Sequence, residues 1–201
     1  WDGTTGTSEF NIFGAAVNKG SLTYKLPAIE MMGATINLTA DYDPQANVAA
    51  PSAGAVGADG ASGEAFTVAI AHESGITVGG GNMKVGNTNS TTGESAATGY
   101  IKYSNGPLTV GYQEFYYNAA TGAADTDGDG YAIAYTMGDM TLSYAVETEQ
   151  TNAIGSTAAL EEEEMSAIQA AYTMGGMTVA ASIYESDNVE GVAAVKYEET
   201  E

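Results

Sequence analysis

The sequence predicts an all-β fold in which the chain runs up and down as an antiparallel meander. Three observations predict it: a repeated turn unit, alternation of apolar and polar residues beside each turn, and longer segments of unequal length between the repeats. The clearest repeat is YTMGDMTLSYAVE at residues 135–147, followed by YTMGGMTVAASIYE at residues 172–185. We expect about eleven or twelve strands of roughly 8 to 11 residues each, within a single domain over residues 1–201.

Each repeat has a tight turn at its centre. The pairs Gly138-Asp139 and Gly175-Gly176 supply the positive φ angles that a two-residue hairpin needs. Turns of related design are expected at Asn105-Gly106, at Ser74-Gly75 and within YKLPAIEMMGATINL at residues 24–38. The five turns recur at spacings of roughly 30 to 50 residues, so the hairpin is the repeated unit of the architecture.

The segments around the turns alternate with a period of two. In MTVAASI, residues 177–183, the residues Met177, Val179 and Ile183 share one face, while Thr178 and Ser182 share the other. The same alternation is seen in SLTYKL at 21–26, in ATINLTADY at 34–42 and in VAAVKY at 192–197. A period of two predicts strands with one apolar face and one small or polar face.

Longer segments rich in Gly, Ala, Ser, Thr and Asn separate the hairpins. They are residues 44–64, 87–96, 118–130, 150–164 and 186–191. Tight turns are therefore expected at one end of the sheet and variable loops at the other. The segment AALEEEEMSAIQAAY at 158–172 is open to two interpretations, a strand or a short helical turn, because Ala, Leu and Glu favour helices.

The charge balance excludes one class of partner. The chain has 26 acidic residues against 5 Lys and Arg combined, a net charge of −21 and no cysteine. A nucleic-acid partner is excluded because no basic surface exists to neutralise phosphates. With one histidine and no GxSxG, Walker or zinc-ligand spacing, we expect no enzymatic activity.

One-faced strands can be arranged in two ways. Either the apolar faces meet in a water-soluble sandwich, or they point outward into a bilayer around a polar interior. Tyr24, Tyr103, Tyr135 and Tyr172 precede tight turns, which is typical of an aromatic girdle at a membrane interface; cross-strand aromatic packing is the alternative. Strands near ten residues with a Thr, Ser and Asn-rich second face favour a transmembrane β-barrel.

The repeat YTMGDMTLSYAVE, the unit YSNGPLTVGYQEFYYN at 103–118 and the acidic, glycine-rich loops resemble general diffusion porins of Gram-negative bacteria, of the marine alphaproteobacterial type. The resemblance implies a homotrimeric outer-membrane barrel of about 16 strands, in contact with lipid and lipopolysaccharide, with one external loop folded inward. The chain departs from that pattern because it has no arginine, begins WDGTTGTSEF and ends KYEETE. We therefore expect an incomplete porin chain that lacks its leader and closing strands.

In a barrel of this kind the function is passive diffusion of small hydrophilic solutes or ions. The excess of carboxylates predicts a preference for cations. Lys25, Lys102 and Lys196 fall at inward parity, opposite tyrosines, and Asp41 and Gln113 share that parity. These five residues are the candidate pore-lining groups; the alternative is that they are ordinary solvated surface.

One segment suggests a metal site. In DTDGDGY, the residues Asp125, Asp127 and Asp129 precede Gly130, and carboxylates on alternate residues of a tight loop can converge on Ca²⁺. The flanking helices of an EF-hand are missing, so the choice lies between a weak Ca²⁺ site and a solvated acidic turn. No other cofactor is expected. The run Glu161 to Glu164 is interpreted as exposed charge, and His72 is assigned no catalytic or metal-binding role.

A second function from another class stays open at this point. It is a soluble, secreted acidic β-protein, such as a calcium-assisted adhesin or a surface-layer component. That interpretation requires the aliphatic face to be buried against protein, whereas the channel exposes it to lipid. The residues that decide between them are Ile36, Leu38, Val110, Leu142 and Val179.

Overall fold

The computed structural model describes residues 22–44, 62–86, 93–119, 124–152, 160–189 and 192–200. The regular elements in these ranges are twelve β-strands, which confirms the predicted all-β fold. The strands are β1 (Leu22–Lys25), β2 (Ile29–Met31), β3 (Ala34–Asp43), β4 (Gly63–His72), β5 (Ile76–Val85), β6 (Glu94–Asn105), β7 (Leu108–Asn118), β8 (Asp125–Met137), β9 (Met140–Asn152), β10 (Glu163–Met174), β11 (Met177–Asp187) and β12 (Lys196–Thr200).

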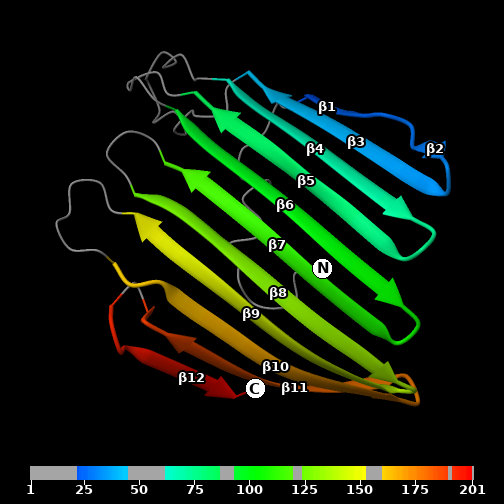
Figure 1. Cartoon of the computed structure of the whole chain (residues 1–201), viewed down its shortest axis with the longest axis vertical. Coiled ribbons are helices and arrows are strands. Elements are labelled where there is room, and N and C mark those ends of the chain that lie inside the picture. Colours follow the sequence, from blue (N-terminus) through cyan, green and yellow to red (C-terminus); the bar gives the residue numbers. More distant parts are fainter. Residues whose placement is uncertain are drawn as a thin grey trace, which may run out of the picture.

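The twelve strands form one antiparallel sheet that follows the chain order (Figure 1). Each strand from β3 onward pairs with its neighbours in sequence, as an up-and-down meander requires. The tight turns lie together along one end of the sheet, on the right of Figure 1, and the strands are joined by longer connections at the other end. We call these the turn end and the loop end. The open choice over residues 158–172 is settled from Glu163 onward, where β10 is a strand.

The first two strands occupy a single position at the edge of the sheet. Both β1 and β2 pair with β3, along its loop-end and turn-end halves respectively. Pro27 lies between them and cannot donate a backbone hydrogen bond, so the ladder is interrupted there. The neighbouring Leu26 amide still donates to the Leu38 carbonyl, at 3.1 Å.

The tight turns differ in which of their central residues have positive φ, and at Ser74-Gly75 only Gly75 does. Both central residues have positive φ at Met32-Gly33 and at Gly175-Gly176, as a type I′ turn requires. At Gly138-Asp139 only the glycine has positive φ. The expected Asn105-Gly106 turn is wrong by one residue: Asn105 pairs with Leu108, so the turn is Gly106-Pro107. Gly106 takes the positive φ and the Pro107 ring fixes a negative one.

From β5 onward, successive hairpins are displaced along the strand direction by a constant step. Ile76 pairs with Tyr103, and β6 continues for two more residues to Asn105. Leu108 with Tyr135, and Met140 with Tyr172, give the same two-residue overhang for β8 and β10. The displacement is two residues for every two strands crossed. With the usual rise per residue and spacing between strands, the strands tilt by about 35° from the perpendicular to the line of turns. A stagger of this size is what rolling a sheet toward a barrel requires.

The sheet is open in the described residues. Its two edge positions are β1 with β2 at one side and β12 at the other, and these edges do not pair with each other (Figure 1). The structure thus has the meander of the predicted fold without ring closure. Among the described ranges, no helix is long and apolar enough to cross a membrane.

The pairing register divides the side chains between two faces, because cross-strand partners point the same way. The apolar face carries, for example, Ile36, Ile70, Val78, Ile101 and Ile133. The polar face carries the residues of the other parity, which are mostly Thr, Ser, Gly, Ala and charged groups. We keep the names apolar face and polar face below.

Exposure differs sharply between the two faces. Among the described strands, the exposed large hydrophobic side chains lie on the apolar face, with Tyr197 as the exception. The one buried hydrophobic cluster of the described residues lies on the polar face instead, near the loop end, and consists of Ala65, Met83, Val85 and Ala96 with Tyr117 packed beside it. Among the described residues, the apolar side of this sheet is therefore largely uncovered, with Val146 near the loop end as the buried exception.

The five aliphatic residues that distinguish a lipid-facing channel from a soluble protein are also at least partly exposed. Leu142 is 46% exposed and Val179 is 58% exposed. Ile36, Leu38 and Val110 are half-buried. None of the five is buried against protein in the described structure.

Three of the four tyrosines lie at the same depth, measured from the turn end of the sheet. Tyr103, Tyr135 and Tyr172 are on the apolar face, each three residues before the first glycine of its turn. The expectation for Tyr24 is wrong, because it pairs with Ala40, in the loop-end half of β3. The chain between Tyr24 and its turn contains the Pro27 interruption, so Tyr24 lies much farther from the turn end than the others.

Candidate functional site

The polar face is lined at the turn end by hydroxyl pairs. Ser104 with Thr109, Thr136 with Thr141, and Thr173 with Thr178 each face one another across a hairpin, with oxygen–oxygen distances of 3.0 to 3.1 Å. These pairs exist because three of the tight hairpins have a hydroxyl on both strands at the same distance from the turn; the first hairpin instead pairs Glu30 with Thr35. The turn end of the polar face is consequently hydrophilic and nearly uncharged.

Four of the five predicted pore-lining residues lie on this face. Lys25 pairs with Thr39, and Asp41 accepts a hydrogen bond from the Thr23 hydroxyl on the same pair of strands. Lys102 lies between Thr77 and Gly111 in the register.

Gln113 is the fourth of these residues, and its amide nitrogen donates to the Thr98 hydroxyl at 2.9 Å. The four residues form two separate groups, on β1–β3 and on β6–β7. They are not brought together into one constriction.

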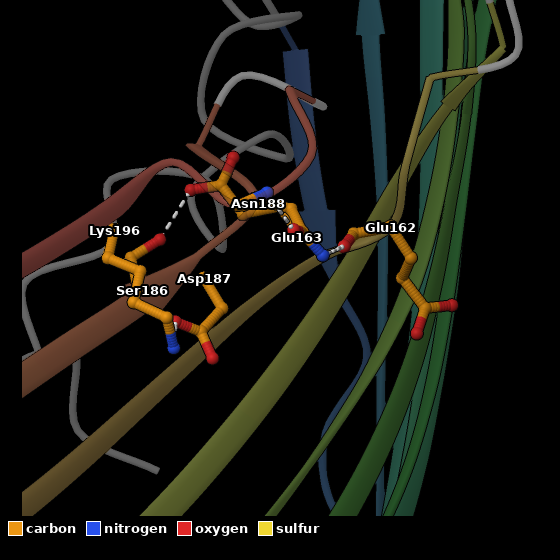
Figure 2. A network of polar contacts seen from close by, with 7 residues as sticks. Glu162, Glu163, Ser186, Asp187, Asn188 and Lys196 are labelled. Atoms are coloured by element: carbon orange, nitrogen blue, oxygen red, sulfur yellow. Dashed lines mark hydrogen bonds and ion pairs between the residues drawn. The ribbon is translucent and has the colours of Figure 1, made fainter.

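Lys196 is on the wrong face for that assignment. It pairs with Asp187 on the apolar face, and its ammonium nitrogen lies 2.7 Å from the Asp187 carboxylate (Figure 2). The parity was counted from Val192, but Ala194 has a positive φ and belongs to a turn, so the strand begins only at Lys196. Tyr197, rather than Lys196, therefore points to the polar face.

Acidic side chains gather on the polar face toward the loop end, and sequence reasoning missed them. Glu149 lies directly opposite Glu163 across β9 and β10, and Glu147 is one step nearer the turns. Glu163 accepts a hydrogen bond from the Ser186 hydroxyl at 2.7 Å (Figure 2). Glu147 is buried. Counting in twos from the Gly175-Gly176 turn places Glu163 on this face, but the segment 150–164 had been assigned to a loop.

Two aromatic rings lie close to glycines on the polar face. A Cβ atom at Gly79 would lie 2.6 Å from the Tyr100 ring, and one at Gly128 would lie 2.7 Å from the Phe115 ring. Gly79 pairs with Tyr100, and Phe115 pairs with Gly128, so each ring covers the bare backbone of its cross-strand neighbour. The rings are thereby held against the sheet instead of projecting from it.

The proposed calcium loop is a strand. Asp125, Asp127 and Asp129 belong to β8 and share the apolar face. Alternate residues of a strand are separated by about 6.6 Å, so three carboxylates in this conformation do not converge on one ion as in a tight loop.

Each of the three carboxylates has its own partner, with Asp125 bonding the Ala119 amide, Asp127 the Asn152 amide and Asp129 the Thr148 hydroxyl. The described residues contain no group of three His, Cys, Asp or Glu positioned to hold a metal. The expectation of a loop at 118–130 was wrong from Asp125 onward.

The acidic run at Glu161 to Glu164 divides between two environments. Glu162 offers its backbone carbonyl to the Asn188 side chain at 3.0 Å (Figure 2). Glu163 faces the polar side and Glu164 the apolar side, because β10 begins at Glu163. His72 forms a local turn contact, with its Nδ1 atom 2.8 Å from the Ser74 hydroxyl.

Comparison with known proteins adds no family to this description: no known family matches the chain, and no curated protein is significantly similar to it. The fold defines the structural class of the chain, which is an all-β antiparallel meander with one apolar face and one polar face.

Proposed function

We propose that the chain is a channel-forming, porin-like protein of the bacterial outer membrane, through which small hydrophilic solutes or ions diffuse passively. The polar face lines the water-filled path, and the apolar face contacts lipid.

The observation that carries the proposal is the uncovered apolar face. Tyr, Ile, Leu, Val and Met side chains stand exposed across the whole width of the sheet, from Leu22 to Ile183. In water each such side chain, being about half exposed, leaves on the order of 1 kcal/mol of burial free energy unrealised. In a bilayer the hydrocarbon supplies that burial, and no second protein layer is needed.

The band of apolar residues has a boundary at its loop end. Along β8 the side chains of the apolar face are apolar from Met137 to Tyr131. The next ones on that face are the carboxylates of Asp129, Asp127 and Asp125. Along β11 it runs from Met177 to Ile183 and then changes to Glu185. With a strand tilt of about 35° and tyrosines at one depth, this arrangement supports a membrane-crossing band flanked by polar ends.

The charges on the polar face support a preference for cations. The acidic residues of the described strands on that face outnumber the lysines; they are Glu30, Asp41, Asp43, Glu94, Glu147, Glu149, Glu163 and Glu199, against Lys25 and Lys102. Fixed negative charge along a water-filled path raises the local concentration of cations and lowers that of anions.

The proposal includes a closed barrel, because an unpaired strand edge in hydrocarbon leaves backbone groups unsatisfied. Further strands must then pair with β1 and β12. We place the assembled protein in the outer membrane as a homotrimer, in contact with lipid and lipopolysaccharide. Mass determination in detergent tests the trimer.

The decisive experiment is conductance in planar bilayers, with the reversal potential measured across a KCl gradient. The fold offers a matched pair of variants, because Glu149 opposite Glu163 on the polar face resembles Glu185 opposite Glu198 on the apolar face. We expect Glu149→Gln with Glu163→Gln to weaken cation preference, and Glu185→Gln with Glu198→Gln to leave it unchanged. Anion preference in the parent protein would overturn the selectivity.

The proposal as a whole is overturned by a different outcome. If the folded chain stays soluble and monomeric without detergent and gives no conductance, the secreted acidic β-protein becomes the better interpretation. Solubility is measured by sedimentation after detergent removal, and the fold by circular dichroism.

A further inference from the structure

The repeated unit YTMGxMT places two methionines around each of two adjacent turns, and the channel proposal does not use them. Met137 pairs directly with Met140 across Gly138-Asp139, and Met174 pairs with Met177 across Gly175-Gly176. Partners in a hairpin share a face and have Cβ atoms about 4.5–5.5 Å apart. Each pair therefore brings two thioether sulfurs within reach of a common ligand.

The two pairs form one continuous strip on the apolar face at the turn end. Met140 pairs with Tyr172 on the neighbouring strand. Tyr172 lies two residues before Met174, on the same strand and the same face. The two hairpins are joined at their turns, because the Thr173 amide donates to the Asp139 carbonyl at 2.8 Å. Four thioethers are thus lined up along the ends of β8, β9, β10 and β11.

Three of these four methionines are exposed, and Met140 is half-buried. Met137 is 50% exposed, and Met174 and Met177 are each 58% exposed. The surrounding segments, residues 135–142 and 172–179, contain one charged residue, Asp139, and no lysine. An approaching cation meets no positive charge there, and the chain has no cysteine to compete for a soft metal.

We propose that the Met137–Met140 and Met174–Met177 pairs bind a soft monovalent cation, Cu(I) or Ag(I). Thioether sulfur is an uncharged, polarisable ligand that selects such ions over Ca²⁺, Mg²⁺ and Zn²⁺. Tyr172, the direct neighbour of Met140, adds a ring whose face attracts cations. The proposal is independent of channel activity, since the strip lies on the opposite face from the proposed water-filled path, at the margin of the apolar band where β8 to β11 end in exposed turns.

Packing beside the turns does not require methionine at all four positions. The corresponding turn-closing pairs in other hairpins are Met31 with Ala34 and Asn105 with Leu108. Those pairs show that the position accepts leucine, alanine and a polar amide. Two Met–Met pairs in neighbouring hairpins supply a ligand set that the other turns lack.

Silver(I) nitrate titrated into the folded full-length chain in chloride-free detergent solution tests the proposal, by calorimetry and native mass spectrometry. We expect Met137→Leu with Met140→Leu, and separately Met174→Leu with Met177→Leu, to lose at least about half of the bound Ag⁺, and the fourfold variant to lose all of it. Leucine keeps the apolar volume. The control is Met83→Leu, a buried residue on the polar face, which should retain parent binding.

A second measurement covers variants that fold poorly. In the parent chain, bound Ag⁺ should slow peroxide oxidation of the four paired methionines, resolved by peptide mass spectrometry, and leave Met32 unaffected. Met32 is 89% exposed and lies at a different turn. Ag⁺ binding that persists unchanged in the fourfold variant, or uniform oxidation of all exposed methionines with and without Ag⁺, overturns the proposal.

Discussion

The two faces of this sheet are built by the same strands and differ only in parity, yet they have opposite chemistry. Along β8, for example, Tyr131, Ile133 and Tyr135 face one side, while Ala132 and Ala134 face the other. The apolar side is the more exposed, and the polar side holds the buried cluster around Met83. A water-soluble sheet usually has the reverse arrangement, so this difference between the faces supports the proposed contact with lipid.

The largest effect is expected from placing a charge on each face at adjacent positions. Ile133 and Ala134 are adjacent in β8, level with the middle of the apolar band. Ile133 lies on the apolar face and Ala134 lies on the polar face. With lipid on the apolar face, Ile133→Arg should cost about 2–4 kcal/mol of folding free energy in vesicles, whereas Ala134→Arg should cost much less. Urea titration of the protein folded into lipid vesicles measures both.

Equal costs for the two arginine variants would contradict lipid contact at Ile133. A larger cost at Ala134 would place the dry side of the sheet on the face that we assign to water. Ala134→Gln and Ile133→Gln, with no charge, serve as controls for size.

A second test compares two glycines of neighbouring strands. A Cβ at Gly79 would lie 2.6 Å from the Tyr100 ring, while one at Gly99 would meet nothing within 4 Å. Gly79→Ala should therefore destabilise the protein by about 1–3 kcal/mol through overpacking, and Gly99→Ala should change stability by less than about 1 kcal/mol. The same urea titration resolves the difference.

The ring is responsible for that difference if Tyr100→Ala reduces the cost of Gly79→Ala. In a double-mutant cycle the pair should be non-additive by about 0.5 kcal/mol or more. Additive costs would show that the tight site at Gly79 is set by the backbone instead.

The fold was predictable because its pattern is local. A period of two and glycine-centred turns depend on neighbouring residues, so the meander and the face of Val179 or Ile183 could be derived by counting from Gly176. The one-residue error at Asn105-Gly106 has the same origin: both Asn and Gly tolerate positive φ, and only the observed pairing shows which residues are central.

The site was less predictable because parity depends on where each strand begins. Lys196 was assigned to the polar face by counting through a turn, and Asp125 to Asp129 were assigned to a loop because Asp and Gly disfavour strands. In the structure the ladder continues through them, since β7 and β9 on either side supply hydrogen bonds. The opposed Glu149 and Glu163 were overlooked because cross-strand partners distant in sequence follow only from the register.

The smallest effect concerns the hydroxyl pairs, which lie where the polar face is nearly uncharged. The Thr173 and Thr178 hydroxyls are 3.0 Å apart, and Thr136 and Thr141 are 3.1 Å apart. Replacing one Thr of a pair by Val leaves the other hydroxyl without that partner, but water on the polar face can take its place. We expect a coupling of about 0.2–1 kcal/mol between Thr173→Val and Thr178→Val in a double-mutant cycle. A coupling of several kcal/mol would mean that this face is dry at the turn end, and would contradict a water-filled path there.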